Sequence, residues 1–263
     1  MSTPGRPKGE SLSARREGSP VSAPDATLRA VLIDLDGTLM DTAPDIAMAA
    51  NRMRAEFGLA ALPVARVASF VGKGADVLVH RALTDAIDGT VDEATYARGR
   101  AAFFRHYHAV NGDAAVLFEG ARAALAQLRG ADLRIACVTN KAREFTVPLL
   151  ERMQIADRFD AVVAGDDVRE KKPHPALLLA ACAQLGVAPA QAAMIGDSVN
   201  DALAARAAGM PVVLVETGYN EGESVHSLAG SPGVGAILPR LVDAAAWVVD
   251  LARGGRAEQS PQR

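Results

Sequence analysis

The second half of this chain repeats a pattern that strongly limits its fold, because short apolar runs alternate with helix-like segments. Such alternation is typical of βα units. The apolar runs contain few polar residues, which predicts strands buried on both faces of a parallel sheet. The expected strands are 133–138, 161–164, 192–195 and 212–215, and the expected helices are 119–129, 142–153, 175–185 and 199–208.

A first strand, 28–33, is expected far upstream of this repeat. Between residues 44 and 117 we expect no strand, and the helix-period patterns there are 46–57, 62–72, 75–87 and 92–110. We therefore predict an α/β protein with a doubly wound, Rossmann-like parallel-sheet core and a helical cap inserted after the first strand. The predicted core domain is 28–43 with 118–253, and the predicted cap domain is 44–117.

Composition narrows the class of protein. The chain has 263 residues, of which 49% are hydrophobic, so it can bury a sizeable core. Residues 1–27 and 254–263 have few large apolar side chains and are predicted to be disordered tails. A net charge of −3 does not favour nucleic acid as a partner, and no apolar run reaches the ~18 residues that a membrane helix needs. Without a signal-peptide pattern, and with two cysteines in apolar segments, we expect a cytoplasmic protein.

Polar residues stand at the ends of the expected strands or in the loops that follow them. The carboxyl ends of parallel strands lie at one edge of a sheet, where such folds bind ligands, so these residues can converge. They are Asp34, Asp36, Thr139, Asn140, Lys172, Asp197 and Asp201. Two carboxylates as close as Asp34 and Asp36 repel each other unless a cation or a shared proton relieves them. They are therefore candidates for a Mg²⁺-assisted nucleophile with a general acid/base.

Most of these residues also have a purely structural interpretation, although Asp197 is harder to explain in this way, because Gly196 before it permits close approach of another group. Asp34 and Asp36 fit an acidic turn after a strand, and Asn140 fits the N-cap of the following helix. Lys172 fits a solvated loop charge, and Asp201 fits a capping box with Ser198. Their joint occurrence in this order along the chain favours a phosphate site over chance.

Four segments that contain these residues resemble the four motifs of the haloacid dehalogenase superfamily, over roughly residues 29–250. They are Asp34-Leu-Asp-Gly-Thr, the strand that ends in Thr139-Asn140, Lys172-Pro173, and Gly196-Asp197-Ser-Val-Asn-Asp201. The resemblance implies that Asp34 is the nucleophile and Asp36 the general acid and base. It also implies that Mg²⁺ is held by Asp34, the main-chain carbonyl of Asp36, and Asp197, and that Asp201 orients waters or Lys172. Thr139, Asn140 and Lys172 would then stabilise the transferring phosphoryl group.

Within this superfamily, Asp36 favours hydrolysis of phosphate esters, since the branches that cleave carbon–halogen and phosphonate bonds lack it. Residues 70–81, with Gly72-Lys73-Gly74, resemble the cap segment of bacterial phosphoglycolate phosphatases, as do 172–175 and 217–222. The resemblance implies Mg²⁺-dependent hydrolysis of 2-phosphoglycolate, a small phosphorylated organic acid, in glycolate and carbohydrate metabolism. Lys73 would contact this substrate, although a flexible charged turn is the alternative. Arg81 is a second candidate, but we expect it on the helix surface.

Three other functions stay open at this point. The chain could be another small-molecule phosphatase that acts on a nucleotide or a sugar phosphate, or a phosphomutase with the same core chemistry. It could also be a non-catalytic scaffold of the same fold. The complete set of Asp34, Asp36, Lys172 and Asp197 argues against the scaffold.

Overall fold

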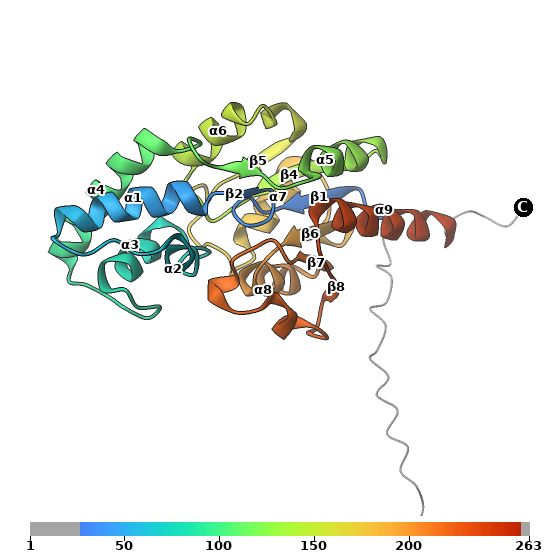
Figure 1. The fold of residues 1–263 in the computed structure, drawn as a ribbon. Helices are drawn as coiled ribbons and strands as arrows, with labels where there is room; N and C mark the ends of the chain where they lie inside the picture. The colour runs from blue at the N-terminus through green and yellow to red at the C-terminus, as the bar shows by residue number, and fades with distance from the viewer. Residues whose placement is uncertain (1–26, 259–263) are drawn as a thin grey trace, which may run out of the picture.

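The computed structural model describes residues 27–258, and its centre is a six-stranded parallel sheet (Figure 1). The strand order is β5-β4-β1-β6-β7-β8, and every neighbouring pair is parallel. The strands are β1 (Ala30–Ile33), β4 (Arg134–Val138), β5 (Ala161–Val163), β6 (Ala192–Gly196), β7 (Val212–Val215) and β8 (Val234–Leu238). The chain winds outward from β1 in both directions, which confirms the predicted doubly wound core.

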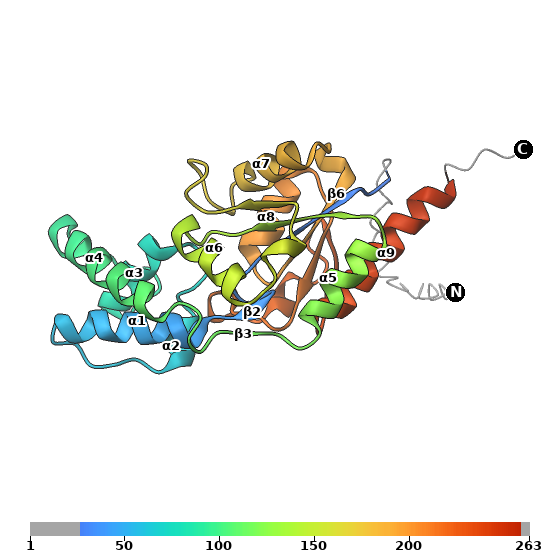
Figure 2. The ribbon, with the colours of Figure 1, turned by 90° about the horizontal axis from the view of Figure 1, so that it is seen from above.

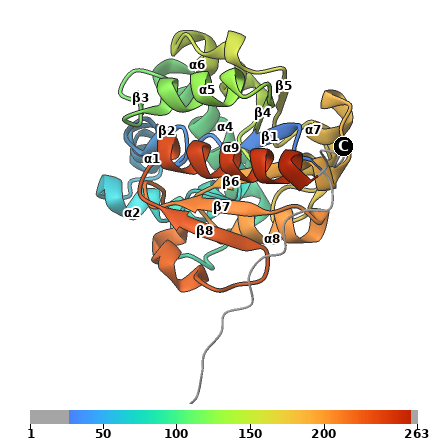
Figure 3. The same ribbon diagram turned by 90° about the vertical axis from the view of Figure 1, so that its right-hand side faces the viewer.

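Helices cover both faces of this sheet (Figures 2 and 3). On one face lie α5 (Ala121–Gly130), α6 (Arg143–Arg152) and α9 (Leu241–Glu258), and on the other α7 (Ala176–Leu185) and α8 (Val199–Ala208). Alternate residues of β1 serve the two faces, because Val31 and Ile33 pack on the first side while Ala30 and Leu32 pack on the second. This two-sided burial explains why the strands are apolar throughout.

The cap consists of four helices beside the carboxyl edge of the sheet (Figure 2). They are α1 (Ala43–Glu56), α2 (Val64–Ala68), α3 (Ala75–Thr84) and α4 (Glu93–Val110). Their apolar faces form a hydrophobic cluster of their own, which Phe145 of α6 joins from the core. The ring of Phe145 lies 4.7 Å from that of Tyr107 and 5.0 Å from that of Phe104. The four cap helices span residues 43–110, against a predicted cap of 44–117, and the division of the chain into two domains remains a prediction.

A short antiparallel strand pair joins the cap to the core. Strand β2 (Met40–Asp41) lies where the chain enters the cap and pairs with β3 (Val116–Leu117), where it leaves. We expected no strand between residues 44 and 117, and β3 corrects that expectation, because two residues are too few to show a strand period. Beside this pair, the fully buried Asp45 carboxylate accepts hydrogen bonds from three backbone N–H groups of residues 112–115.

The C-terminal part of the core contains two elements that we did not predict, β8 and α9. Helix α9 continues through Gly254 to Glu258, so the predicted tail boundary at residue 254 is wrong. A glycine costs a helix only ~1 kcal/mol, which need not end one that is already formed and packed. Residues 1–26 and 259–263 of the predicted tails lie outside the described residues. Within residues 27–258, none of the helices has the length and apolar character needed to cross a membrane.

Candidate active site

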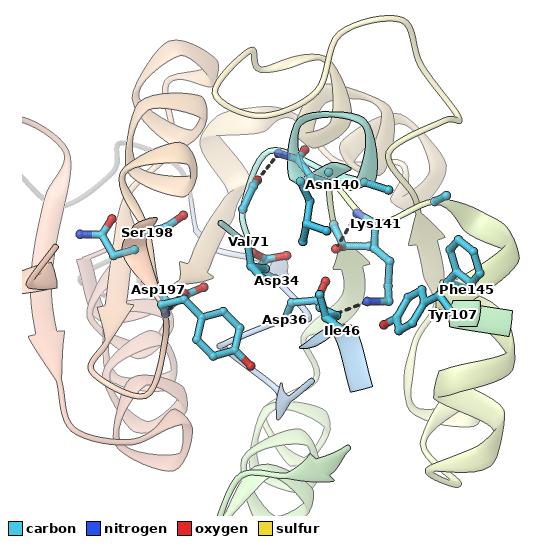
Figure 4. Close-up of a pocket in the computed structure, with 18 of the residues that line it drawn as sticks. Asp34, Asp36, Ile46, Val71, Tyr107, Asn140, Lys141, Phe145, Asp197 and Ser198 are labelled. Atoms are coloured by element: carbon cyan, nitrogen blue, oxygen red, sulfur yellow. Dashed lines mark hydrogen bonds and ion pairs between the residues drawn. The ribbon is translucent and has the colours of Figure 1, made fainter. Parts of the chain in front are cut away.

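Three adjacent strands of the sheet deliver polar residues to one pocket between the core and the cap (Figure 4). Because β4, β1 and β6 are neighbours, Thr139, Asp34 and Asp197 emerge side by side at their carboxyl ends. The core side of the pocket also carries Asp36, Asn140, Lys141, Phe145, Ser198 and Tyr219. The cap side is largely apolar and carries Ile46, Val71, Leu78, Phe103 and Tyr107.

Asp34 and Lys172 form a buried ion pair at the floor of this site. The Lys172 Nζ lies 2.9 Å from Asp34 Oδ1 and 2.7 Å from Asp201 Oδ1, and it also donates to the carbonyl of Val138. Burial raises the pKa of Asp34 well above its usual value, and the nearby Asp201 and Asp197 add to this, against the opposing effect of Lys172. Burial alone would lower the pKa of Lys172, but the two carboxylates outweigh it and raise that pKa.

Asp197 lies beside this pair and is held by two donors. Its Oδ1 accepts from the Thr38 hydroxyl at 2.9 Å, and its Oδ2 accepts from the Tyr219 N–H at 3.0 Å. Burial, followed by the charge of Asp201, raises the pKa of Asp197 to about 7. Gly37 is required for this approach, since it has a φ of +85° and a Cβ there would lie 2.6 Å from Asp197 Oδ2.

Asp201 fills the structural role that its sequence context allows and also contacts the site. Its Oδ2 accepts from the N–H and hydroxyl of Ser198, which forms the expected capping box at the start of α8. Its other oxygen is paired with Lys172. Both carboxylate oxygens therefore already have partners within the protein, which suits a group that orients Lys172 more than one that binds a metal directly.

The donor set of this site fits a hard divalent cation. Oxygen atoms of Asp34, Asp197 and Asp201 all lie within 4.8 Å of one another. Three buried carboxylates face one lysine here, so negative charge exceeds positive charge and the pKa values rise. Carboxylate and carbonyl oxygens are the ligands that Mg²⁺ prefers. The site is therefore suited to a metal ion.

The Asp36 carboxylate is not a member of this three-carboxylate cluster and has partners of its own. Its Oδ1 accepts from the Thr42 hydroxyl at 2.6 Å and lies 2.9 Å from the Nζ of Lys141. Sequence reasoning missed Lys141, although its place directly after Asn140 at a strand end was a usable signal. Burial alone would lower the pKa of Lys141, but the charge of Asp36 outweighs it and raises that pKa.

Asn140 ties together two loops that border the pocket. Its amide Nδ2 donates to the carbonyls of Gly72 at 2.7 Å and Lys172 at 2.9 Å, and its Oδ1 accepts from the Lys172 N–H. The amide thus holds the cap loop against the core. Thr139 is 1% exposed, and its hydroxyl oxygen accepts from the N–H of Lys141.

Lys73, predicted to contact the substrate, is paired with a residue of the loop after β7. Its Nζ lies 3.1 Å from Glu221 Oε1, while an Arg81 Nη2 lies 3.2 Å from Oε2 of the same carboxylate. The expectation that Arg81 lies on the helix surface is wrong, since it is 2% exposed and donates to two backbone carbonyls. Burial would raise the pKa of Glu221, but Lys73 and Arg81 hold it below its usual value.

Known hydrolases are similar to this chain in both sequence and structure. The family model of the haloacid dehalogenase-like hydrolases matches residues 31–215. The phosphoglycolate phosphatase of Nitrosospira multiformis is 46% identical over 217 residues, which cover 82% of this chain and 94% of the relative. The plasmid phosphoglycolate phosphatase of Cupriavidus necator is 50% identical over 190 residues, which cover 72% and 81%. A crystal structure described as a predicted phosphoglycolate phosphatase from Haemophilus somnus is 28% identical, with a TM-score of 0.77 over 84% of this chain and 98% of that one.

Proposed function

The chain belongs to the haloacid dehalogenase-like hydrolases, and from this premise we propose that it is a Mg²⁺-dependent phosphatase that hydrolyses 2-phosphoglycolate to glycolate and phosphate. The observation that carries the proposal is the buried cluster in which Asp34, Lys172 and Asp197 meet beside Asp36. The identity to phosphoglycolate phosphatases over most of the chain supports the choice of substrate.

Asp34 is the nucleophile of the first step. A carboxylate oxygen attacks phosphorus in line with the ester oxygen, a bond forms between Asp34 and phosphorus, and the bond from phosphorus to the ester oxygen breaks. Asp36 gives its proton to the departing oxygen, so that glycolate leaves with a neutral hydroxyl. The product on the enzyme is an aspartyl-phosphate.

In the second step, water hydrolyses this intermediate. Asp36 takes a proton from the water, whose oxygen attacks phosphorus, and the bond between Asp34 and phosphorus breaks. Inorganic phosphate forms, while Asp34 regains its carboxylate and Asp36 regains its proton. Asp36 is suited to both proton transfers because it lines the pocket beside Asp34 without belonging to the cluster of carboxylates.

Positive charge and hydrogen-bond donors stabilise the transferring phosphoryl group. Lys172, held by Asp34 and Asp201, faces the attacking carboxylate, and the groups at the end of β4, Thr139 and Asn140, border the same space. Mg²⁺ would be held by Asp34, Asp197 and the main-chain carbonyl of Asp36, and when bound it would neutralise charge on the phosphoryl oxygens.

The apolar cap surface over the pocket excludes water from the reacting groups, which strengthens these charge interactions. The contact of Asn140 with the cap loop at Gly72 and the pairing of Glu221 with Lys73 hold the cap closed. Breaking these contacts would let the cap move away from the core, so that substrate can enter and product can leave.

A panel of phosphate esters tests the proposed substrate. Purified enzyme with Mg²⁺ should give its highest kcat/KM with 2-phosphoglycolate, compared with a nucleoside monophosphate and a sugar phosphate. Addition of a chelator should abolish the activity, and added Mg²⁺ should restore it. Similar kcat/KM values across the panel would favour a general small-molecule phosphatase, and no turnover of any ester would favour a non-catalytic scaffold.

Substitution of Asp34 tests the nucleophile. Asp34→Asn should lower kcat at least about a thousandfold, because the amide oxygen is a poor nucleophile for phosphorus. The matched control is Asp157→Asn, which removes a carboxylate that is 75% exposed and should leave kcat unchanged. Phosphate release by Asp34→Asn at a rate near that of the wild type would refute the assignment.

We also propose that the enzyme works in the cytoplasm. Cys137 and Cys182 are both buried and unpaired in the structure, which suits a compartment that keeps thiols reduced. Fractionation of the source cells tests this proposal. Recovery of the protein in the cytoplasmic fraction would support it, and recovery in the periplasmic fraction would refute it.

A further inference from the structure

Lys141 is the only cationic residue among those that line the pocket in the described part of the chain. We propose that Lys141, together with the hydroxyl of Tyr107, binds the carboxylate of the substrate and so selects phosphate esters of acids. This inference rests on the proposed function, because it concerns the part of 2-phosphoglycolate that does not react.

The lysine is buried in an ion pair and still has an unused N–H donor. Its side chain is 5% exposed, and its Nζ lies 2.9 Å from Asp36 Oδ1 and 4.9 Å from the centre of the Tyr107 ring (Figure 4). An ammonium has three N–H donors, of which one is directed to Asp36 and one to the Tyr107 hydroxyl oxygen within residues 27–258. The third donor is available to a ligand in the pocket.

The size of the substrate places its carboxylate near Lys141. Asp36 must contact the ester oxygen to protonate it, and in 2-phosphoglycolate a single methylene separates that oxygen from the carboxylate group. The carboxylate must therefore lie close to Asp36 whenever the phosphate is bound for reaction. Lys141 already contacts Asp36, whereas Lys73 is paired with Glu221 and is not among the residues that line the pocket.

Tyr107 supplies a second, independent sign of a ligand. Its hydroxyl is buried and interacts with the Lys141 ammonium, but no described residue accepts the proton of this hydroxyl in a hydrogen bond. A buried hydroxyl proton without an acceptor is costly, so an acceptor atom of a bound ligand would satisfy it. Burial raises the pKa of Tyr107 to about 12, so this hydroxyl keeps its proton at neutral pH and can donate it to a carboxylate. The apolar side chains of Ile46 and Phe103 complete this end of the pocket.

Selectivity follows from the same contacts. A carboxylate that reaches Lys141 and Tyr107 gains a charge-assisted hydrogen bond and a neutral one in a site with little water. An ester without the carboxylate gains neither and leaves the proton of the tyrosine hydroxyl without an acceptor. The enzyme should therefore discriminate against neutral analogues even though the reacting phosphate is the same.

Matched pairs of substrates isolate this contribution. The first pair is 2-phosphoglycolate and ethyl phosphate, and the second is 3-phosphoglycerate and glycerol 3-phosphate. In each pair, the preference is the ratio of kcat/KM for the acid to kcat/KM for its neutral partner. If the substitution of Lys141 acts through Asp36, it changes kcat/KM for both substrates of a pair, and the change cancels in the ratio. If it removes a contact with the carboxylate, it lowers kcat/KM for the acid only, and the ratio falls.

Lys141→Met should lower the preference about 10-fold to 100-fold, which is the range for hydrogen bonds to charged groups. Tyr107→Phe removes a single oxygen and should lower it about fivefold, which keeps the test available if Lys141→Met does not fold. The matched control Lys73→Met removes a lysine at the boundary of cap and core, and it should leave the preference as in the wild type.

The outcomes separate this inference from the proposed function. A preference for 2-phosphoglycolate that persists in Lys141→Met and Tyr107→Phe overturns the inference and leaves the function standing. A preference that occurs only in the 3-phosphoglycerate pair and collapses in these variants supports the inference and refutes the proposed substrate. A preference that is lost only in Lys73→Met would overturn the inference and assign binding of the carboxylate to the cap loop. A wild-type enzyme with no preference in either pair would refute both proposals.

Discussion

Replacement of Asp197 by asparagine should make the folded protein without metal less sensitive to pH. The pKa of this carboxyl is about 7 in the folded protein, mainly because it is buried, against a reference value of 3.8. Between about pH 4 and pH 7, the folded protein therefore holds a proton that the unfolded chain has already lost. The free energy of unfolding must then fall as the pH rises through this range, and the loss is complete above it.

The size of this effect follows from the difference between the two pKa values. Roughly three pKa units, at about 1.36 kcal/mol each, correspond to about 4 kcal/mol. Asparagine does not titrate, and it can keep both hydrogen bonds of Asp197. Its Oδ1 can accept from the Tyr219 N–H, and its amide can donate to the Thr38 hydroxyl oxygen. From pH 4 to pH 8, Asp197→Asn should therefore gain up to about 4 kcal/mol relative to the wild type.

Urea unfolding of both proteins in the presence of a chelator, at several pH values from 4 to 8, measures this difference. The exposed Asp157→Asn variant serves as the control and should follow the wild type. At pH 8, added Mg²⁺ should stabilise the wild type and have little effect on Asp197→Asn, since binding to the folded state raises its stability. A difference between Asp197→Asn and wild type that stays constant with pH would refute this account of the carboxylate cluster.

Two further substitutions test how the cap is attached. Glu221→Gln removes the charge that pairs with Lys73 and with the buried Arg81, and it should lower the free energy of unfolding by about 1.5–3 kcal/mol in urea titrations. A loss below about 0.5 kcal/mol would contradict the role of this carboxylate. Asp45→Ala leaves three backbone N–H groups of residues 112–115 without their acceptor and should cost about 3 kcal/mol or more. Faster hydrogen exchange of these three amides would show that the loss of stability arises from their missing acceptor, and unchanged exchange would contradict this explanation.

Much of the fold was predictable because it depends on local pattern. A strand such as β1 is apolar at every position, since alternate residues pack against helices on opposite faces, and this leaves a continuous run in the sequence. Elements without such a pattern were missed. Strand β3 has only two residues, and α9 extends past a glycine that locally suggests a helix end. Their stability comes from partners distant in the chain.

In the site, too, some features were predictable from the sequence and others depend on contacts between distant segments. Asp34, Lys172 and Asp197 were predictable as a group because parallel strands and the loops after them end at one edge of a sheet. Sequence position gave no sign that Asn140 spans two loops, or that Arg81 is buried against Glu221, 140 residues away. Both facts depend on how the cap packs against the core. Contacts between a cap side chain and a core side chain produce no periodic pattern in the sequence, so they could not be predicted from it.

For this protein, the sequence alone indicated the class of fold, five of the six strands of the parallel sheet and the polar residues that the structure gathers at the strand ends. These follow from periodicity and from residue types at strand ends, which are local properties. The tertiary structure decided which lysine faces the pocket. Lys73 and Lys141 both stand beside predicted site segments, yet one pairs with Glu221 and the other reaches Asp36. Only the packing of cap against core separates them, because burial and charge pairing depend on contacts between distant segments.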